Sequence, residues 1–357
     1  MLHKKYIFSS GRRKFLCGIY IIAGIILVSS CRKNLYNHPL LDDKFVVLAE
    51  ITAGDSANIP IGKTLPAGSG NSVIFKKINS VAASITAQDG SIQQLSLNTS
   101  QDFISNPMAV YSGPGNFLYN TEYTLTATDP LLGTISATTN IPNDFSVSHV
   151  ETEHDEFNGK QVLRFKFVID DAGNEKNFYF FEAVKQLVML SRYFYWQGTK
   201  YDYDTQSGYD LFQQVGNNPG VNLLLDTMLT HQFIRLNVFT RDNRTENFKM
   251  SSLDSSFRRI FVSDSTFNGR EFETEIFIAR DQFIAANPQQ LGVVQVQVKS
   301  VSKELYDYLS QYEKYTLDFG NFPVNNLSSP VGNIKNGLGV FGGSCRKQWS
   351  FYYDMLK

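Results

Sequence analysis

The chain has 357 residues, with 28 Phe, 18 Tyr and a formal net charge of −1. A charge balance this close to neutral, with no basic stripe along the sequence, argues against a nucleic acid as the partner. The chain also exceeds the length of a typical single domain, so we expect two domains.

The N-terminus has the features of an export signal. Basic residues are followed by an apolar run that ends at Val28 and is too short to cross a membrane, which takes about 20 residues. Val28, Ser29, Ser30 and Cys31 then fit a lipobox, in which small residues allow cleavage and the thiol accepts diacylglycerol. We therefore predict a lipoprotein signal peptide at residues 1–30 and a lipid anchor at Cys31.

Cysteine usage agrees with this interpretation. Cys17 lies in the predicted signal and Cys31 would carry lipid, so Cys345 is the one thiol left in the mature chain. A single thiol forms neither an intramolecular disulfide nor a cysteine-based metal cluster. We expect Cys345 to be a small buried residue.

The first part of the mature chain has the pattern of a β domain. Residues 31–43 are polar and are predicted to be the lipidated tether. Short runs of alternating apolar and polar residues follow, separated by Gly, Asn, Asp and Ser, which is typical of strands. These runs are residues 44–52, 80–90, 92–98, 123–129 and 133–142. About 100 residues of this kind match an immunoglobulin-like sandwich, so we predict a β-sandwich domain at residues 44–143.

Residues 144–357 are predicted to form the second domain. Turn residues at 170–174 and at Asn268-Gly269 each lie between two apolar runs, which indicates two β-hairpins. Residues 293–301 alternate between valine and polar side chains, as in a strand.

The best helix signal falls at residues 302–315, where apolar side chains recur on one helical face. They are Leu305, Tyr308, Leu309 and Tyr312. The predicted fold class is therefore mostly β: an N-terminal immunoglobulin-like β-sandwich followed by a second, larger antiparallel β domain with one or two short helices.

Three glycines near the end of the chain, Gly337, Gly339 and Gly342, have the spacing of a dinucleotide-binding loop. That loop needs a helix after it, whereas residues 344–353 have the pattern of a strand, and no acidic ribose partner follows. We expect the glycines to allow turns with positive φ or a close backbone approach, and we predict no bound cofactor.

A cluster of potential metal ligands lies at the predicted domain junction. It contains His149, Glu151, Glu153, His154, Asp155 and Glu156. Alternate positions on a strand share a face, so these groups could hold zinc or a hard cation. Charges at a domain junction are usually solvated, and for that reason we predict no metal site.

The most unusual stretch is rich in tyrosine and surrounds a polar turn. Its aromatic side chains with polar tips are candidate contacts for a ligand or a partner protein. They are Tyr193, Tyr195, Trp196, Tyr201 and Tyr203. The alternative is that one face of this stretch is core and the other covers a loop.

The sequence lacks the usual catalytic motifs. It has no Gly-x-Ser-x-Gly elbow and no His-Glu-x-x-His helix, so we predict that the protein is not an enzyme. A glycosidase needs only two carboxylates, so a hydrolase with dispersed carboxylates is the catalytic alternative.

Several segments follow one another in a recognisable order. After the lipobox come "KFVVLAEIT", "FKFVIDDAGNEKNFYFFEAV", "VKSVSKELYDYL" and "NIKNGLGVFGG". In this order the chain resembles Bacteroidota outer-membrane lipoproteins of domain-of-unknown-function family 4249. The resemblance implies an outer-membrane lipoprotein, often encoded beside TonB-dependent receptors that import nutrients.

We therefore expect a non-catalytic outer-membrane lipoprotein that is an accessory binding or docking component of a TonB-dependent uptake system. The alternative is a structural or adhesive cell-envelope protein without a transported ligand. Lipoproteins displayed on the cell surface often carry acidic residues directly after the lipidated cysteine, whereas Arg32 and Lys33 follow here and acid first appears at Asp42. The surface face and the periplasmic face both stay open.

Overall fold

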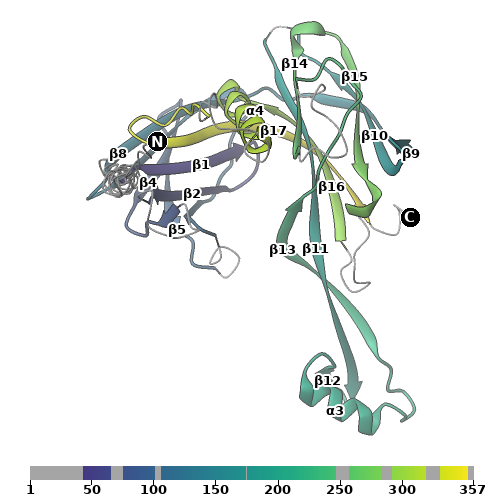
Figure 1. Cartoon of the computed structure of the whole chain (residues 1–357). Helices are drawn as coiled ribbons and strands as arrows, with labels where there is room; N and C mark the ends of the chain where they lie inside the picture. Colours follow the sequence, from purple (N-terminus) through teal and green to yellow (C-terminus); the bar gives the residue numbers. More distant parts are fainter. Residues whose placement is uncertain are drawn as a thin grey trace, which may run out of the picture. The chain divides into compact units, whose positions relative to one another are not determined.

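The computed structural model describes residues 43–65, 75–100, 106–173, 175–246, 257–282, 292–318 and 330–352. The predicted signal peptide, Cys31 and nearly all of the predicted tether lie outside these residues. The described part is mostly β with large antiparallel sheets and two α-helices, which confirms the predicted fold class at that level (Figure 1). The immunoglobulin-like topology and the boundary between residues 143 and 144 stay predictions.

The first group of strands surrounds one apolar core. Its members are β1 (Phe45–Thr52), β2 (Ala57–Thr64), β3 (Phe75–Lys77), β4 (Ala82–Ala87), β5 (Ile92–Leu97), β6 (Ala109–Gly113), β7 (Thr121–Asp129) and β8 (Gly133–Ile141). In β7 the side chains of Tyr123, Leu125 and Ala127 are buried in this core, while the alternating threonines are more exposed. The alternation of apolar and polar residues in the sequence therefore correctly predicts which side chains of β7 face the core.

The remaining strands are longer. They are β9 (Ser146–Phe157), β10 (Lys160–Asp170), β11 (Phe178–Trp196), β12 (Thr199–Asp202), β13 (Leu224–Arg235), β14 (Arg259–Ser263), β15 (Glu271–Ala279), β16 (Gly292–Val301) and β17 (Leu338–Tyr352). Strands β15, β10 and β9 form a three-stranded sheet, and the others join the sheet of the first group. A second core lies between these two sheets, where the rings of Phe167 and Phe181 are 5.5 Å apart.

Both predicted hairpins are wrong. Strand β10 pairs with β9 and β15, whereas β11 pairs with β12, β13, β14 and β16, so the chain crosses from one sheet to the other between them. The same holds for β14 and β15. At each crossing, the two consecutive strands lie on opposite sides of the second core. The two crossing segments are joined by a hydrogen bond, in which the Gly269 N–H donates to Asp171 Oδ2 at 2.8 Å.

The last strand, β17, belongs to both groups. It pairs in parallel with β1 from Val46↔Leu338 to Thr52↔Ser344, and antiparallel with β16 from Val293↔Tyr352 to Val301↔Ser344. Phe341 is buried in the first core and Cys345 in the second. The residues predicted for the second domain thus complete the sheet that begins with β1.

Two helices accompany the strands. The predicted helix is confirmed as α4 (Lys303–Asp318), which buries Leu305 and Tyr306 against Phe180 and Val340. Helix α3 (Gln206–Val215) was not predicted as an element; it begins after Thr205, whose hydroxyl accepts from the Gly208 N–H at 3.2 Å. Two short 3₁₀ turns occur at Asp264–Thr266 and Arg280–Gln282. Across the described ranges, every helix is too short or too polar to span a bilayer.

The glycines near the C-terminus form the start of β17 and the approach to it. Gly339 has φ +100°, and a Cβ atom there would lie 1.9 Å from the Val47 carbonyl oxygen. A Cβ on Gly342 would lie 2.4 Å from Leu305 Cβ. The expectation of positive φ and close approach is confirmed. Gly339 and Gly342 lie within strand β17 and not in a turn.

Gly339→Ala should lower the free energy of unfolding by about 3 kcal/mol or more, because it combines a left-handed backbone with a clash against β1. Gly90→Ala is the matched control, since Gly90 has φ +85° with no atom within 4 Å of a built Cβ. The control should lose only about 1 kcal/mol. Urea unfolding followed by circular dichroism measures both, and equal losses would contradict the role of the close approach.

Candidate functional site

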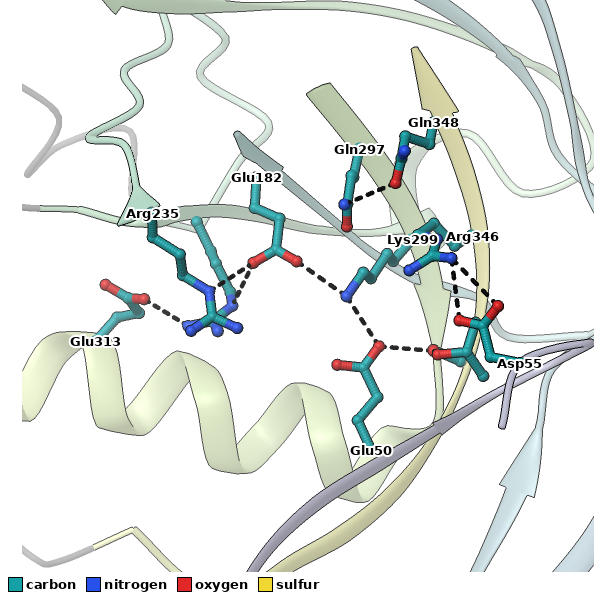
Figure 2. A network of polar contacts seen from close by, with 12 residues as sticks. Glu50, Asp55, Glu182, Arg235, Gln297, Lys299, Glu313, Arg346 and Gln348 are labelled. Carbon is teal, nitrogen blue, oxygen red and sulfur yellow. Dashed lines mark hydrogen bonds and ion pairs between the residues drawn. The ribbon is translucent and has the colours of Figure 1, made fainter. Parts of the chain in front are cut away.

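A network of charges, most of them buried, lies where α4 meets β1, β11 and β16 (Figure 2). Its members come from segments far apart in the sequence and alternate in sign. They are Glu50, Glu182, Arg235, Arg259, Lys299 and Glu313. A charge inside a protein is tolerated only when it is paired, so each member depends on the next.

Lys299 is the centre of the network. Its Nζ lies 2.9 Å from Glu50 Oε1 and 2.9 Å from Glu182 Oε1. Burial works to lower the pKa of Lys299, but the two carboxylates outweigh it and the pKa rises. Burial likewise works to raise the pKa of Glu50, and the Lys299 ammonium is the main cause that brings it below its ordinary value. All three groups are therefore charged at neutral pH.

The network continues from Glu182 toward helix α4. Glu182 Oε2 lies 3.1 Å from Arg235 Nε and 3.3 Å from Arg259 Nε. Arg259 Nη1 in turn donates to Glu313 Oε1 at 2.8 Å, and the backbone N–H of Arg258 donates to Glu313 Oε2 at 3.1 Å. Helix α4 is thus tied to β14 by a buried ion pair as well as by apolar packing.

On the other side, the network reaches β17. The Ser344 hydroxyl donates to Glu50 Oε1 at 2.7 Å and lies 2.8 Å from Thr52 Oγ1. Ser344 is fully buried where β17 pairs with both β1 and β16. The two hydroxyl groups thus form a buried hydrogen bond at the Thr52–Ser344 pair of the two parallel strands.

A pocket of about 640 Å³ opens beside the network. Helix α4 supplies Leu305, Tyr308, Leu309, Tyr312 and Glu313, and strands and loops supply Leu48, Ala49, Glu50, Arg235, Arg258, Arg259 and Val340. The lining is therefore partly apolar and aromatic and partly charged, with three arginines. Pockets of this size and mixed character are typical of small-molecule sites.

The structure separates the five predicted aromatic residues onto two faces of a hairpin. Trp196, Tyr201 and Tyr203 are half-buried around Phe194, Val215 and Val221, in a small core beneath α3. Tyr193 and Tyr195 lie on the opposite face, with their rings 5.8 Å apart and Tyr195 50% exposed. The first face is therefore core, as in the second alternative, and Tyr193 and Tyr195 stay candidate contacts.

The structure also places the acidic stretch and Cys345. The acidic stretch is the exposed strand β9, where Glu153 and Asp155 pair with Arg164 and Asp155 also pairs with Arg241. Within the described ranges, no three His, Cys, Asp or Glu side chains are grouped so that they could hold a metal ion. Cys345 is buried as expected, and burial, followed by its hydrogen bond to Asp144, raises the pKa of its thiol to about 12. That thiol is protonated at neutral pH.

Sequence reasoning missed the charged network and the pocket. One signal was present: Glu182 interrupts the apolar run "FYFFEAV", and a charge inside a buried strand requires a partner. Lys299 was assigned only to the polar side of an alternating strand. Its partners are 117 and 249 positions away, so their identity could not be read from local pattern.

Lys299→Met should lower the free energy of unfolding by about 3–5 kcal/mol, because it leaves two carboxylates uncompensated inside the protein. Lys303→Met is the matched control, since Lys303 forms an exposed ion pair with Asp307 one helical turn away. The control should change stability by less than about 1 kcal/mol. Urea unfolding tests both; a loss in Lys299→Met no larger than in the control would show that the network is not a stabilising unit.

Glu182→Gln should change how stability depends on pH. Burial works to raise the pKa of Glu182, but Lys299, Arg259 and Arg235 lower it below the ordinary value of 4.5. A lowered pKa stabilises the folded state fully above that ordinary value, and the effect is lost as pH falls toward the folded value. The stability gap between wild type and variant should therefore narrow below about pH 4.5. Unfolding measured between pH 7 and 3 checks this, and a constant gap would refute it.

Comparisons with known proteins give one informative match. A search of curated proteins finds no match. One solved structure that matches is that of the Enterococcus faecalis MSCRAMM ACE, described as binding its ligands by the collagen Hug model. It is 7% identical, covers 84% of this chain and 96% of its own, and has a TM-score of 0.16, so it carries no argument. Residues 35–349 match a family model. Because that match spans most of the sequence, the chain belongs to the family described as Domain of unknown function (DUF4249).

Proposed function

We propose that the protein is a non-catalytic, lipid-anchored outer-membrane protein that docks on a TonB-dependent receptor as an accessory of uptake. The observation that carries the proposal is the outer end of the β11 hairpin, which has its own core and exposes apolar side chains. The lipobox-like motif is the reason for proposing attachment to a membrane. The family resemblance is the reason for proposing a TonB-dependent receptor as the partner. Both belong to the proposal.

The outer half of β11 is held differently from the inner half. Residues 179–187 of β11 pair with β16, whereas residues 193–196 pair with the short strand β12, and residues 184–193 pair with β13. Gln197 and Gly198 make the turn between β11 and β12 with φ values of +49° and +80°, as in a tight hairpin. This hairpin tip, residues 193–225, carries helix α3.

The hairpin tip is preorganised. Arg192 forms two contacts with the Asp204 carboxylate, at 2.7 Å from Nε and 2.6 Å from Nη2, and its guanidinium lies 4.7 Å from the centre of the Tyr203 ring. Phe194 is completely buried against Tyr201, with ring centres 5.6 Å apart. A surface fixed in this way loses little conformational entropy when a partner binds.

The same tip exposes large apolar side chains. Tyr195 is 50% exposed, Leu224 39% and Leu225 58%. Tyr193 pairs directly with Leu224 across the two strands, so Tyr195 and Leu224 lie on one face. Lys200 lies over the Tyr193 ring at 3.9 Å and forms an ion pair with Asp226 at 3.5 Å, which gives that face a polar margin. An apolar centre with a polar margin is the anatomy of a protein interface.

The double variant Tyr195→Ala/Leu224→Ala should recover about tenfold less receptor than wild type in a pull-down from detergent-solubilised native membranes. The matched control is Ile92→Ala/Leu131→Ala, because these residues are 61% and 93% exposed elsewhere in the chain. Wild type and control should recover a TonB-dependent receptor equally. Absence of any such receptor in repeated wild-type samples, or equal recovery by the tip variant, would refute the docking proposal.

Cys31→Ser should release the protein from the membrane fraction, because serine cannot accept the thioether-linked diacylglycerol that provides the anchor. Cys17→Ser is the matched control: Cys17 lies in the predicted signal peptide, so its substitution should leave the attachment intact. Fractionation of cells and mass spectrometry of the mature N-terminus measure both variants. Membrane attachment of Cys31→Ser, or an unmodified N-terminus in wild type, would refute the anchor.

A further inference from the structure

We infer that the pocket between helix α4 and the charged network binds a small organic anion: a carboxylate or phosphate group carried on an aromatic or branched apolar body. This inference does not rest on docking to a receptor, because the pocket residues are separate from those of the hairpin tip.

The apolar part of the pocket suits a ring or a branched chain. Tyr308 and Tyr312 on α4 stack with their ring planes 9° apart and their centres 6.5 Å apart. Leu309 and Val340 extend the wall that these rings begin. Tyr312 is 45% exposed, so the wall reaches the pocket opening. Flat or branched apolar groups gain both buried area and ring contacts on such a wall.

The charged part of the pocket favours an anion. The carboxylates that line it are already neutralised: Glu50 by Lys299 at 2.9 Å, and Glu313 by Arg259 at 2.8 Å. Because those pairs are internally balanced, the remaining charges decide which ligand is attracted.

Those remaining charges are the guanidinium groups of Arg235 and Arg258. Arg235 contacts Glu182 through Nε, and its side chain is 48% exposed. Arg258 is exposed and donates from Nη1 to the Arg235 carbonyl oxygen at 3.3 Å, which holds the two arginines side by side. Lys299 already balances Glu50, so Arg235 balances Glu182 and the arginine pair retains one net positive charge, that of Arg258. Guanidinium groups bind carboxylates and phosphates through paired hydrogen bonds.

The arrangement disfavours other ligand classes. A cation would meet two arginines at the opening and find the carboxylates occupied. A neutral apolar molecule would leave the arginine pair desolvated without a partner, which costs free energy. An inorganic anion alone would leave the tyrosine wall unused. A molecule with both an apolar body and one negative group satisfies both sides.

The test is calorimetric titration of the detergent-solubilised full chain with three probes. These are 3-phenylpropanoate, its neutral analogue 3-phenylpropan-1-ol, and acetate, which has the charge without the ring. We expect 3-phenylpropanoate to bind at least about tenfold more tightly than either of the others. Repeating the titration with phenyl phosphate shows which anionic group the site prefers.

Variants locate the binding. Arg258→Gln should weaken 3-phenylpropanoate by about tenfold while keeping its affinity for the alcohol. Leu309→Trp should weaken binding of every probe, because the larger ring takes up part of the pocket beside the apolar wall. Arg270→Gln removes an exposed arginine away from the pocket and should change nothing. Circular dichroism and thermal unfolding confirm that each variant is folded.

Three results would overturn the inference. The first is no binding of 3-phenylpropanoate or of phenyl phosphate at about 10 mM, where even a site with a Kd near 1 mM is largely filled. The second is equal affinity for the acid and the alcohol. The third is unchanged affinity in both Arg258→Gln and Leu309→Trp, which would place the binding elsewhere.

Discussion

The ammonium group of Lys299 between two carboxylates is the constraint on which the arrangement of this protein depends. A buried charge without a partner costs several kcal/mol, so Glu50 of β1 and Glu182 of β11 must meet at the same point. Apolar contacts alone would tolerate small shifts of one strand along another. The ion pairs do not, because each places a particular oxygen against a particular nitrogen. They therefore fix how β1, β11 and β16 are aligned.

The sequence predicted elements better than their connections. Alternating apolar residues located strands such as β7 and β16, and the helical spacing of residues 302–315 located α4. The turn at Asp171 was read as a hairpin because a hairpin and a crossing between sheets share the same local pattern. Which sheet the next strand joins depends on distant core partners. The aromatic stretch was likewise identified, but only its three-dimensional pairing separates the half-buried Trp196 from the exposed Tyr195.

The pocket and the hairpin tip solve different physical problems. An anion in the pocket would be repelled by unpaired carboxylates. The ion pairs of the network neutralise the acidic groups that line the pocket. The tip needs a fixed shape of its own, and the packing around Phe194 provides it with few residues. The surfaces that we propose for a small anion and for a protein partner therefore use different residues.

The parallel pairing of β1 with β17 has a consequence for biosynthesis. Val46 lies opposite Leu338, so one side of β1 has to wait for a partner that is translated almost three hundred residues later. During that interval the nascent chain presents an unsatisfied row of amide and carbonyl groups next to an incomplete apolar core, which invites aggregation. Chains of such high contact order fold slowly, so a chaperone that keeps the polypeptide open until its last strand emerges would govern the yield of this protein.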